Sequence, residues 1–365
     1  MAARKPALPP LPGTLLSELR GLIESARQQV AQAANATLTM LYWHVGQRVQ
    51  REVLKNERAE YGEQIVSTLS TQLVAEYGQA FGERSLRRMV QFAEVFPNEN
   101  TVATLSRELS WSHFIEILPL KQPLEREYYA ELCRVERWSV RTLRERIASQ
   151  LYLRTAIAKQ PDAVVRAEIS HLRDDGQMTP DLVFRDPYML DFLGLPHNHS
   201  ERDLEDAILR EMEHFLLELG AGFTFVARQK RISVGADDFY LDLLFYHRHL
   251  KRLVAVELKL EKFQPAHKGQ MELYLRWLDK YDRAAGEEAP IGLILCASKD
   301  AEQVQLMDLG ASHIRVAEYL AHIPDMGVLQ AQLHRAVELA HERAAQEALP
   351  QPANRTKAGN KPKSS

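Results

Sequence analysis

The stretch DDFYLDLLFYHRHLKRLVAVELKL, residues 237–260, places three charged side chains inside two segments that otherwise have the composition of buried strands. Asp242 lies in the first segment, and Glu257 and Lys259 lie in the second. A charge that is removed from water without a partner costs free energy, so a strand with a purely structural role would avoid it. The stretch therefore predicts a hairpin whose charged residues have a chemical task.

Side-chain alternation predicts where these charges point. Successive residues of a strand face opposite sides of the sheet, so Glu257 and Lys259 are expected to point the same way. If the two strands pair as a hairpin, Asp242 lies across from them. We expect one face of the first strand to carry Tyr240, Asp242, Leu244 and Tyr246, and the other face to carry Leu241, Leu243 and Phe245. Two carboxylates and one ammonium group would then meet on a hydrophobic sheet.

This combination of charges has a known chemical use. Two neighbouring carboxylates repel each other, and an all-oxygen site favours Mg²⁺ or Mn²⁺. Such a cation polarises a phosphoryl oxygen and lowers the pKa of bound water, while a nearby lysine stabilises developing charge. The pattern predicts hydrolysis of a phosphodiester, with Asp242 and Glu257 as metal ligands. The structural alternative is an ion pair within the sheet, because Glu-x-Lys also occurs by chance.

Length and composition limit the classes of protein to consider. A chain of 365 residues favours two domains, and its 45% apolar and 26% charged residues are ordinary for a globular protein. The net charge of −3 excludes a global basic field, so any basic surface for nucleic acid must be local. Cys133 and Cys296 predict neither a disulfide framework nor a Cys-based metal site. We expect a cytoplasmic protein that does not associate with a membrane, since neither a signal peptide nor a membrane helix is visible.

Hydrophobic periodicity divides the chain into two regions of different character. We predict a disordered N-terminus over 1–12, a helical domain over 13–160, a connecting segment over 161–200, an α/β domain over 201–345 and a disordered basic tail over 346–365. The α/β domain begins with an amphipathic helix over 201–220, which Gly220 closes. Three strands, a helix and a further strand follow. This order predicts a mixed sheet with helices on both faces.

Longer stretches resemble one known family closely. The C-terminal text FLLELGAGFTFVARQKRISVGADDFYLDLLFYHRHLKRLVAVELKL (215–260), GQMELYL (269–275) and IGLILCASK (291–299) is similar to the nuclease domain of the YhcG-type family of bacterial PD-(D/E)xK proteins. The N-terminal text LYWHVGQRV (41–49), YGEQIVSTLS (61–70) and FGERSLRRMVQFAEVFP (81–97) resembles that family's helical domain. The resemblance spans about residues 14–325. It implies a helical N-terminal domain followed by a restriction-endonuclease-like α/β domain.

The resemblance also implies roles for individual residues. Asp242 and Glu257 match the two active-site acids, and Lys259 matches the catalytic lysine. Glu205 matches an acid that superfamily members often direct at the metal, although an acid near a helix start is also favoured by the helix dipole. Supporting roles fall to Gln270 and Tyr274, which are one helical turn apart and can share a face. Leu241 stands where the superfamily motif often has proline, a position that varies.

The N-terminal region carries a second pattern, two helices joined by a short turn at QAFG (79–82). This spacing predicts a helix-turn-helix whose second helix presents Arg84, Arg87 and Arg88 to nucleic acid. The alternative is an ordinary bundle helix with a charged outer face. The long amphipathic helices could equally join copies of the chain into a homo-oligomer.

These observations converge on a Mg²⁺- or Mn²⁺-dependent endonuclease, with DNA favoured over RNA as the substrate. The helical domain would contribute nucleic-acid binding, partner binding or oligomerisation. Two alternatives stay open at this point. The nuclease fold could be a non-catalytic DNA-binding or assembly module, or the site could process RNA, because the same chemistry cleaves either backbone.

Overall fold

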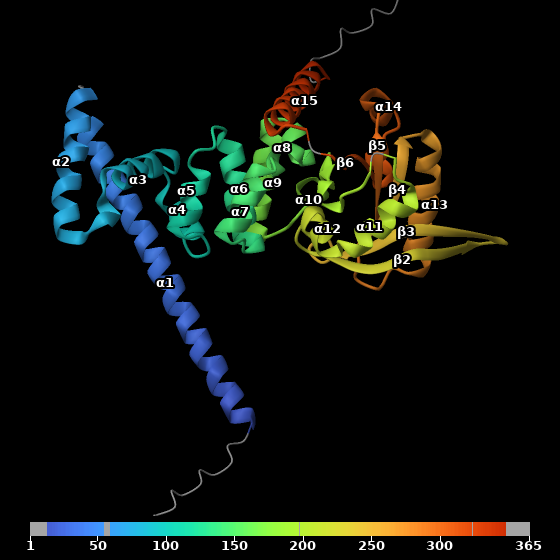
Figure 1. The fold of residues 1–365 in the computed structure, drawn as a ribbon, viewed down its shortest axis with the longest axis horizontal. Helices are drawn as coiled ribbons and strands as arrows, with labels where there is room; N and C mark the ends of the chain where they lie inside the picture. The colour runs from blue at the N-terminus through green and yellow to red at the C-terminus, as the bar shows by residue number, and fades with distance from the viewer. Residues whose placement is uncertain (1–12, 55–58, 197, 323, 348–365) are drawn as a thin grey trace, which may run out of the picture. The chain divides into compact units, whose positions relative to one another are not determined.

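The structure is a computed structural model that describes residues 13–54, 59–196, 198–322 and 324–347. It divides into two compact units, Met1–Ser149 and Gln150–Ser365. The described part of the first unit is helical and that of the second is α/β, as the sequence predicts (Figure 1). The predicted disordered segment 1–12 and residues 348–365 of the predicted tail lie outside the described residues. The other domain boundaries inferred from the sequence stay predictions.

The first unit is a set of helices. They are α1 (Gly13–Leu54), α2 (Ala59–Tyr77), the short 3-10 helix η1 (Gln79–Phe81), α3 (Glu83–Val95), α4 (Glu99–Leu105), α5 (Trp111–Ile117), α6 (Pro123–Glu136) and α7 (Val140–Ala148). Although α1 has 42 residues, none of the helices in the described ranges combines the length and apolarity needed to cross a lipid bilayer.

Helices α1 and α3 approach each other at a glycine. A Cβ atom added to Gly46 on α1 would lie 1.8 Å from the backbone oxygen of Met89 on α3. Around this point the buried residues Val49, Val66 and Leu86 form a hydrophobic core with Met89. The absence of a side chain at Gly46 therefore allows the two helix backbones to come into contact.

The second unit contains the remaining elements. Its helices are α8 (Leu151–Arg154), η2 (Ala156–Lys159), α9 (Asp162–Asp175), α10 (Pro180–Val183), η3 (Asp191–Leu193), α11 (Glu201–Arg210), α12 (Met212–Leu219), α13 (Pro265–Tyr281), α14 (Ala301–Leu306), η4 (Leu309–Ser312) and α15 (Met326–Glu347). Its strands are β1 (Tyr188–Met189), β2 (Phe223–Val234), β3 (Asp237–His247), β4 (Arg252–Lys262), β5 (Ile291–Ser298) and β6 (Ile314–Leu320).

The six strands form one mixed sheet in the order β1-β6-β5-β4-β3-β2. Strands β2, β3 and β4 are antiparallel neighbours, whereas β4, β5, β6 and β1 pair in parallel. Strand β1 comes from the segment 161–200 and pairs Tyr188 with Tyr319. The predicted mixed sheet is confirmed, and its antiparallel half contains the stretch 237–260.

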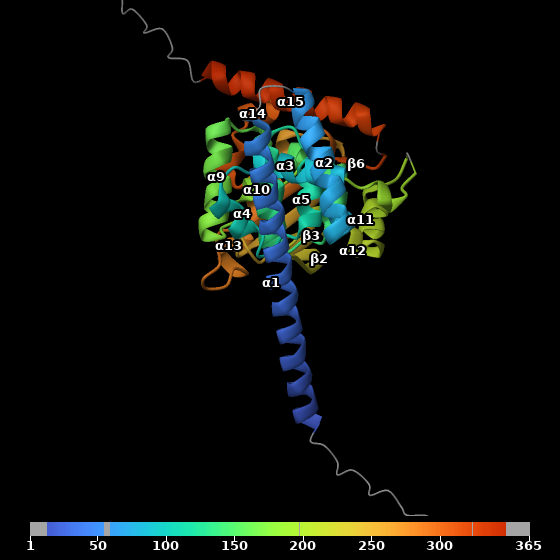
Figure 2. The same ribbon diagram turned by 90° about the vertical axis from the view of Figure 1, so that its left-hand side faces the viewer.

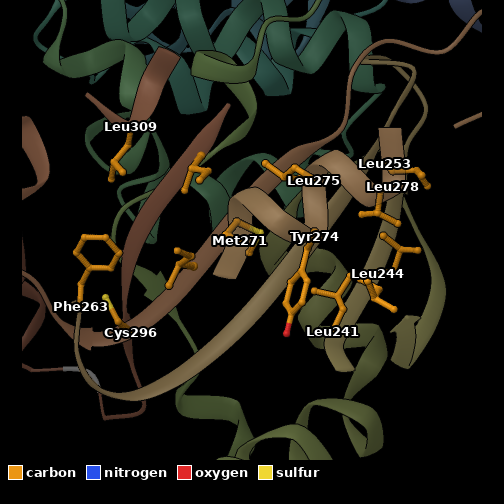
Figure 3. Packing of buried hydrophobic residues seen from close by; sticks show 14 residues of the cluster. Leu241, Leu244, Leu253, Phe263, Met271, Tyr274, Leu275, Leu278, Cys296 and Leu309 are labelled. Carbon is orange, nitrogen blue, oxygen red and sulfur yellow. The ribbon is translucent and has the colours of Figure 1, made fainter. Parts of the chain in front are cut away.

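Helices cover both faces of this sheet. On one face, Met271, Tyr274, Leu275 and Leu278 of α13 pack on a hydrophobic cluster of the sheet, which Figure 3 shows from close by. On the other face, Phe215 of α12 stacks against Phe245 of β3, with ring centroids 6.0 Å apart. Between the charged ends of β3 and β4, Glu257 is buried, and Asp242 and Lys259 are half-buried.

The helix predicted over 201–220 is two helices. Helix α11 ends at Arg210 and α12 begins at Met212, because Glu211 leaves the helical region with φ −104° and ψ 32°. Glu205 in the first helix reaches the sheet near Asp242, while Glu218 in the second helix is buried against Arg154. The hydrophobic pattern of residues 201–220 is continuous and carries no signal for this break.

Strict alternation along 240–246 is also wrong. Leu241 and Leu244 are three residues apart, so strict alternation would place them on opposite faces of the sheet. However, both belong to the cluster under α13 and lie close together in Figure 3. On the neighbouring strand, Gln229 has a left-handed backbone with φ 42°. Arg228 pairs with Leu243 and Lys230 with Leu241, so the register is the same on both sides of Gln229, and the register shift of this strand pair lies between Phe225 and Ala227. The change of face along β3 thus lies across from the positive φ of Gln229.

Replacing Gly46 by alanine tests the contact of α1 and α3. We expect Gly46→Ala to destabilise the helical unit by about 3 kcal/mol, because the new methyl group would overlap the Met89 carbonyl and force the helices apart. Gly21→Ala is the matched control, since a Cβ there meets nothing within 4 Å and alanine favours helix by about 1 kcal/mol. Urea unfolding, with hydrogen exchange of α3 peptides, measures both changes. Equal stability of the two variants would contradict the contact.

Candidate active site

Asp242 lies where strands β3 and β4 separate. Their antiparallel ladder runs from His247 and Arg252 to Leu243 and Val256 and then stops. At the next position the Asp242 Oδ2 atom accepts a hydrogen bond of 2.8 Å from the backbone N–H of Leu258. The carboxylate thus takes the place of a strand carbonyl. Strand β3 continues beyond this point with β2 alone, and β4 continues with β5.

Glu257 and Lys259 meet at this fork. Lys259 Nζ donates a hydrogen bond of 3.0 Å to Glu257 Oε1, so the two side chains point the same way, as alternation predicts. Glu257 is only 4% exposed. Its second oxygen, Oε2, is buried and has no hydrogen-bond partner among the described residues. The ion pair therefore gives a hydrogen-bond partner to one of the two oxygens of this carboxylate.

The carboxylates at the fork are hard to ionise. Burial and the negative charge of Asp242 raise the pKa of Glu257 to about 7, although Lys259 opposes the shift. Burial also raises the pKa of Asp242, against the hydrogen bonds from Leu258 and Gln229. Burial alone would lower the pKa of Lys259, but Glu257 outweighs it and the net shift is upward. The site thus holds a protonated lysine beside carboxylates with excess negative charge.

Glu205 joins the site from α11 through a residue that the sequence did not reveal. The Gln229 amide nitrogen donates to Glu205 Oε2 at 2.7 Å and to Asp242 Oδ1 at 3.1 Å. Glu205 is 8% exposed, and burial is the main cause of its raised pKa. Its other oxygen, Oε1, lies 3.6 Å from Arg228 Nε, which is beyond hydrogen-bond length. No motif in the sequence marks Gln229, because its role depends on its backbone conformation and on contacts with residues far away in the sequence.

Gln270 and Tyr274 share one face of α13, as their spacing predicts. Gln270 Nε2 donates to the Tyr274 hydroxyl at 2.7 Å, and that hydroxyl donates to the backbone carbonyl of Tyr240 at 3.2 Å. Tyr274 is 1% exposed, and burial raises its pKa. The pair therefore anchors β3 two residues before Asp242. Gln270 thus supports the tyrosine, and the tyrosine is the residue that bonds to the strand backbone.

Arg84, Arg87 and Arg88 lie together on α3 in the helical unit, directly after η1. Arg87 pairs with Glu83 at 2.8 Å on the same exposed helix face. The three arginines also line a shallow surface pocket with Glu83 and Gln91. The predicted helix, turn and helix are thus present as elements, and their nucleic-acid role stays a prediction.

The residues at the fork fit a divalent cation. In the described part of the chain, no three His, Cys, Asp or Glu side chains are already grouped closely enough to chelate one. However, Glu257 Oε2 is a buried oxygen without a hydrogen-bond partner there, and three carboxyl groups have raised pKa values. Mg²⁺ commonly binds one or two carboxylates and retains several waters. The oxygen donors of the site match that preference.

Comparisons with known proteins show the family of this chain. Residues 181–334 match the family described as "YhcG PDDEXK nuclease domain", and residues 18–154 match the "DUF1016 N-terminal domain". Over 352 residues the chain is 32% identical to "Putative nuclease YhcG" of Escherichia coli (strain K12), covering 88% of this chain and 93% of that protein. A crystal structure of a repair endonuclease from Pyrococcus abyssi is similar over 36% of this chain and 50% of that one, with 19% identity and a TM-score of 0.25. The chain therefore belongs to the YhcG family of PDDEXK nuclease-domain proteins, as the resemblance of its sequence implied.

Proposed function

We propose that this protein is a metal-dependent endonuclease that hydrolyses phosphodiester bonds in DNA. One observation carries the proposal. Two carboxylates, buried Glu257 and half-buried Asp242, and the Lys259 ammonium group meet at the point where β3 and β4 separate. A structural ion pair would need one acid and one base, whereas this cluster has an excess of negative charge that a divalent cation neutralises.

Each residue of the cluster has a part in the proposed reaction. Asp242 and Glu257, with the Leu258 carbonyl, would hold Mg²⁺ or Mn²⁺, and Glu205 would add negative charge. When bound, the cation polarises the phosphoryl oxygen and lowers the pKa of a bound water. Lys259 keeps its proton next to Glu257 and can orient the attacking water or stabilise charge on the phosphoryl group. Gln270 and Tyr274 hold β3 in place.

We assign nucleic-acid recognition to the helical unit. Arg84, Arg87 and Arg88 lie on α3 behind the short turn that η1 makes after α2. This order of elements supports a helix-turn-helix role, in which the second helix contacts phosphates and bases. The basic residues of 346–365 would add nonspecific attraction to phosphate. A cytoplasmic location, which the unpaired Cys133 and Cys296 favour, stays a prediction.

Variants at the fork test the catalytic proposal. We expect Asp242→Asn, Glu257→Gln and Lys259→Gln each to lower cleavage on the order of 10³-fold, since each removes a metal ligand or the only ammonium group of the cluster. Glu261→Gln and Lys262→Gln are matched controls, because both residues are on β4 and their side chains are more than half exposed. Initial rates on labelled plasmid, linear and branched DNA with Mg²⁺ or Mn²⁺ measure the effect.

The same assay separates the alternatives. Faster cleavage of RNA than of DNA with the same sequence would identify an RNA-processing nuclease, provided that the cleavage is lost in the same variants. Tight DNA binding without cutting, unchanged in all three fork variants, would instead favour a non-catalytic DNA-binding module. Cleavage that survives in Lys259→Gln and Asp242→Asn would place the active site elsewhere.

The raised pKa of Glu257 predicts how cation binding depends on pH. A carboxylate with a pKa of about 7 is ionised at pH 8 and mostly protonated at pH 6, and the proton competes with the cation. We expect Mn²⁺ affinity to fall about tenfold between pH 8 and pH 6. Lys259→Gln should move this transition to higher pH, because Lys259 lowers the pKa of Glu257. Titration calorimetry at each pH tests this, and a flat profile would contradict it.

We also propose that the N-terminal half of α1 joins copies of the chain. Leu16, Leu19, Ile23 and Val30 are 43–70% exposed and follow the 3-4 spacing of a coiled-coil seam. Both Figure 1 and Figure 2 show this half of α1 extending beyond the other helices of its unit.

Charge on this seam should abolish self-association. We expect Leu19→Glu with Ile23→Glu to lower the mass in sedimentation equilibrium to that of one chain, because a charged residue in the seam would be desolvated. Ser17→Glu with Gln28→Glu adds the same charge off the seam and should leave the mass unchanged. Wild-type protein that sediments as a single chain would disprove this proposal.

A further inference from the structure

The Gln229 amide lies between two carboxylates that come from different elements. Its nitrogen donates to Glu205 on α11 and to Asp242 on β3, at 2.7 Å and 3.1 Å. The single NH₂ group has two hydrogen atoms, so each carboxylate can accept one of them. In this way β2 connects the helix to the strand fork. Without such a bridge, two nearby carboxylates would repel each other.

The backbone of Gln229 is unusual for its place in the fold. In the described part of the chain, six non-glycine residues have positive φ, and the other five lie at helix ends or in the turn between β3 and β4. Gln229, with φ 42°, is inside strand β2. Strained backbone of this kind persists where the surrounding structure requires it, often at functional sites. Here the conformation directs the side chain at Glu205 and Asp242.

The chemistry of the side chain matters as much as its position. Arg228 is the nearest cation to Glu205, but its Nε is 3.6 Å away and its side chain is 53% exposed. A lysine or arginine in place of Gln229 would neutralise the carboxylates and compete with a metal ion. A neutral amide orients them by hydrogen bonds and leaves their negative charge available.

From this arrangement we propose that Gln229 is a positioning residue, which holds Glu205 against Asp242 so that both carboxylates serve one cation site. The inference rests on the proposed function of the fork. It assigns Glu205 to the cation site through a residue that no motif marks. Gln229 itself acts through the two acids and is not a catalytic residue.

Gln229→Gly separates this role from a structural one. Glycine accepts positive φ without strain, so the variant should unfold at the same or a higher temperature than wild type. It lacks the amide, so we expect its affinity for Mn²⁺ to fall about tenfold or more, as for other residues that orient metal ligands. Lys251→Gly, at another positive-φ residue in the β3–β4 turn, is the matched control and should bind Mn²⁺ like wild type. Titration calorimetry with Mn²⁺ and thermal unfolding measure both properties.

A double variant tests whether Gln229 acts through Glu205. Glu205→Gln should weaken Mn²⁺ binding by itself, and adding Gln229→Gly should cost much less than the product of the two single effects. If the losses of Mn²⁺ affinity in the two single variants multiply in the double variant, the proposal is overturned. The proposal is also overturned if Gln229→Gly binds Mn²⁺ with an affinity within twofold of wild type, whether or not cleavage is lost. Failure of the proposed function looks different, because wild type would then bind no Mn²⁺, and the inference would fall with it.

Discussion

The hydrogen bond from the Leu258 amide to the Asp242 carboxylate determines how the sheet and the site fit together. A backbone N–H of a central strand must have an acceptor, because burial without one is costly. Here a side chain supplies the acceptor, so the ladder between β3 and β4 can end in the middle of the sheet. Glu257 and Lys259 lie next to the point where the ladder ends. A single interaction thus both satisfies the backbone and places Asp242 beside the other two charged residues.

Two carboxylates elsewhere in the α/β unit, buried Glu218 and half-buried Asp186, show what distinguishes this cluster. Burial raises the pKa of Glu218, but Arg154 and Arg185 more than compensate, and the net shift is downward. Asp186 behaves in the same way beside Lys299 and Lys159. Those acids have more positive than negative neighbours and are stable as they are.

Glu257, Asp242 and Glu205 are shifted in the opposite direction. All three have raised pKa values, first because burial disfavours their charged forms and then because each has another acid nearby, while Lys259 opposes the shift at Glu257 and Asp242. Of these three clusters, the fork is the one in which negative charge is left uncompensated. The balance of charge around an acid thus distinguishes acids that stabilise the fold from acids arranged for chemistry.

The break at Glu211 lets one amphipathic stretch serve both purposes. Glu205 and Glu218 are 13 residues apart, which on a straight helix places them about 140° apart around the axis. In the structure α11 directs Glu205 to the fork, and α12 buries Glu218 against Arg154 at the other end of the sheet. Two short helices can each fit their own surface, whereas one straight helix could not follow both.

We could predict from the amino-acid sequence the order of elements, the mixed sheet, the family and the acids that come together at the fork. These follow from local properties: hydrophobic periodicity, the alternation that places Glu257 beside Lys259, and text close to a known family. Three features emerge in the folded chain alone: the role of Gln229, the helix break at Glu211 and the loss of alternation between Leu241 and Leu244. The physical reason is that strand twist, backbone strain and hydrogen bonds between distant segments depend on packing, which no local pattern records.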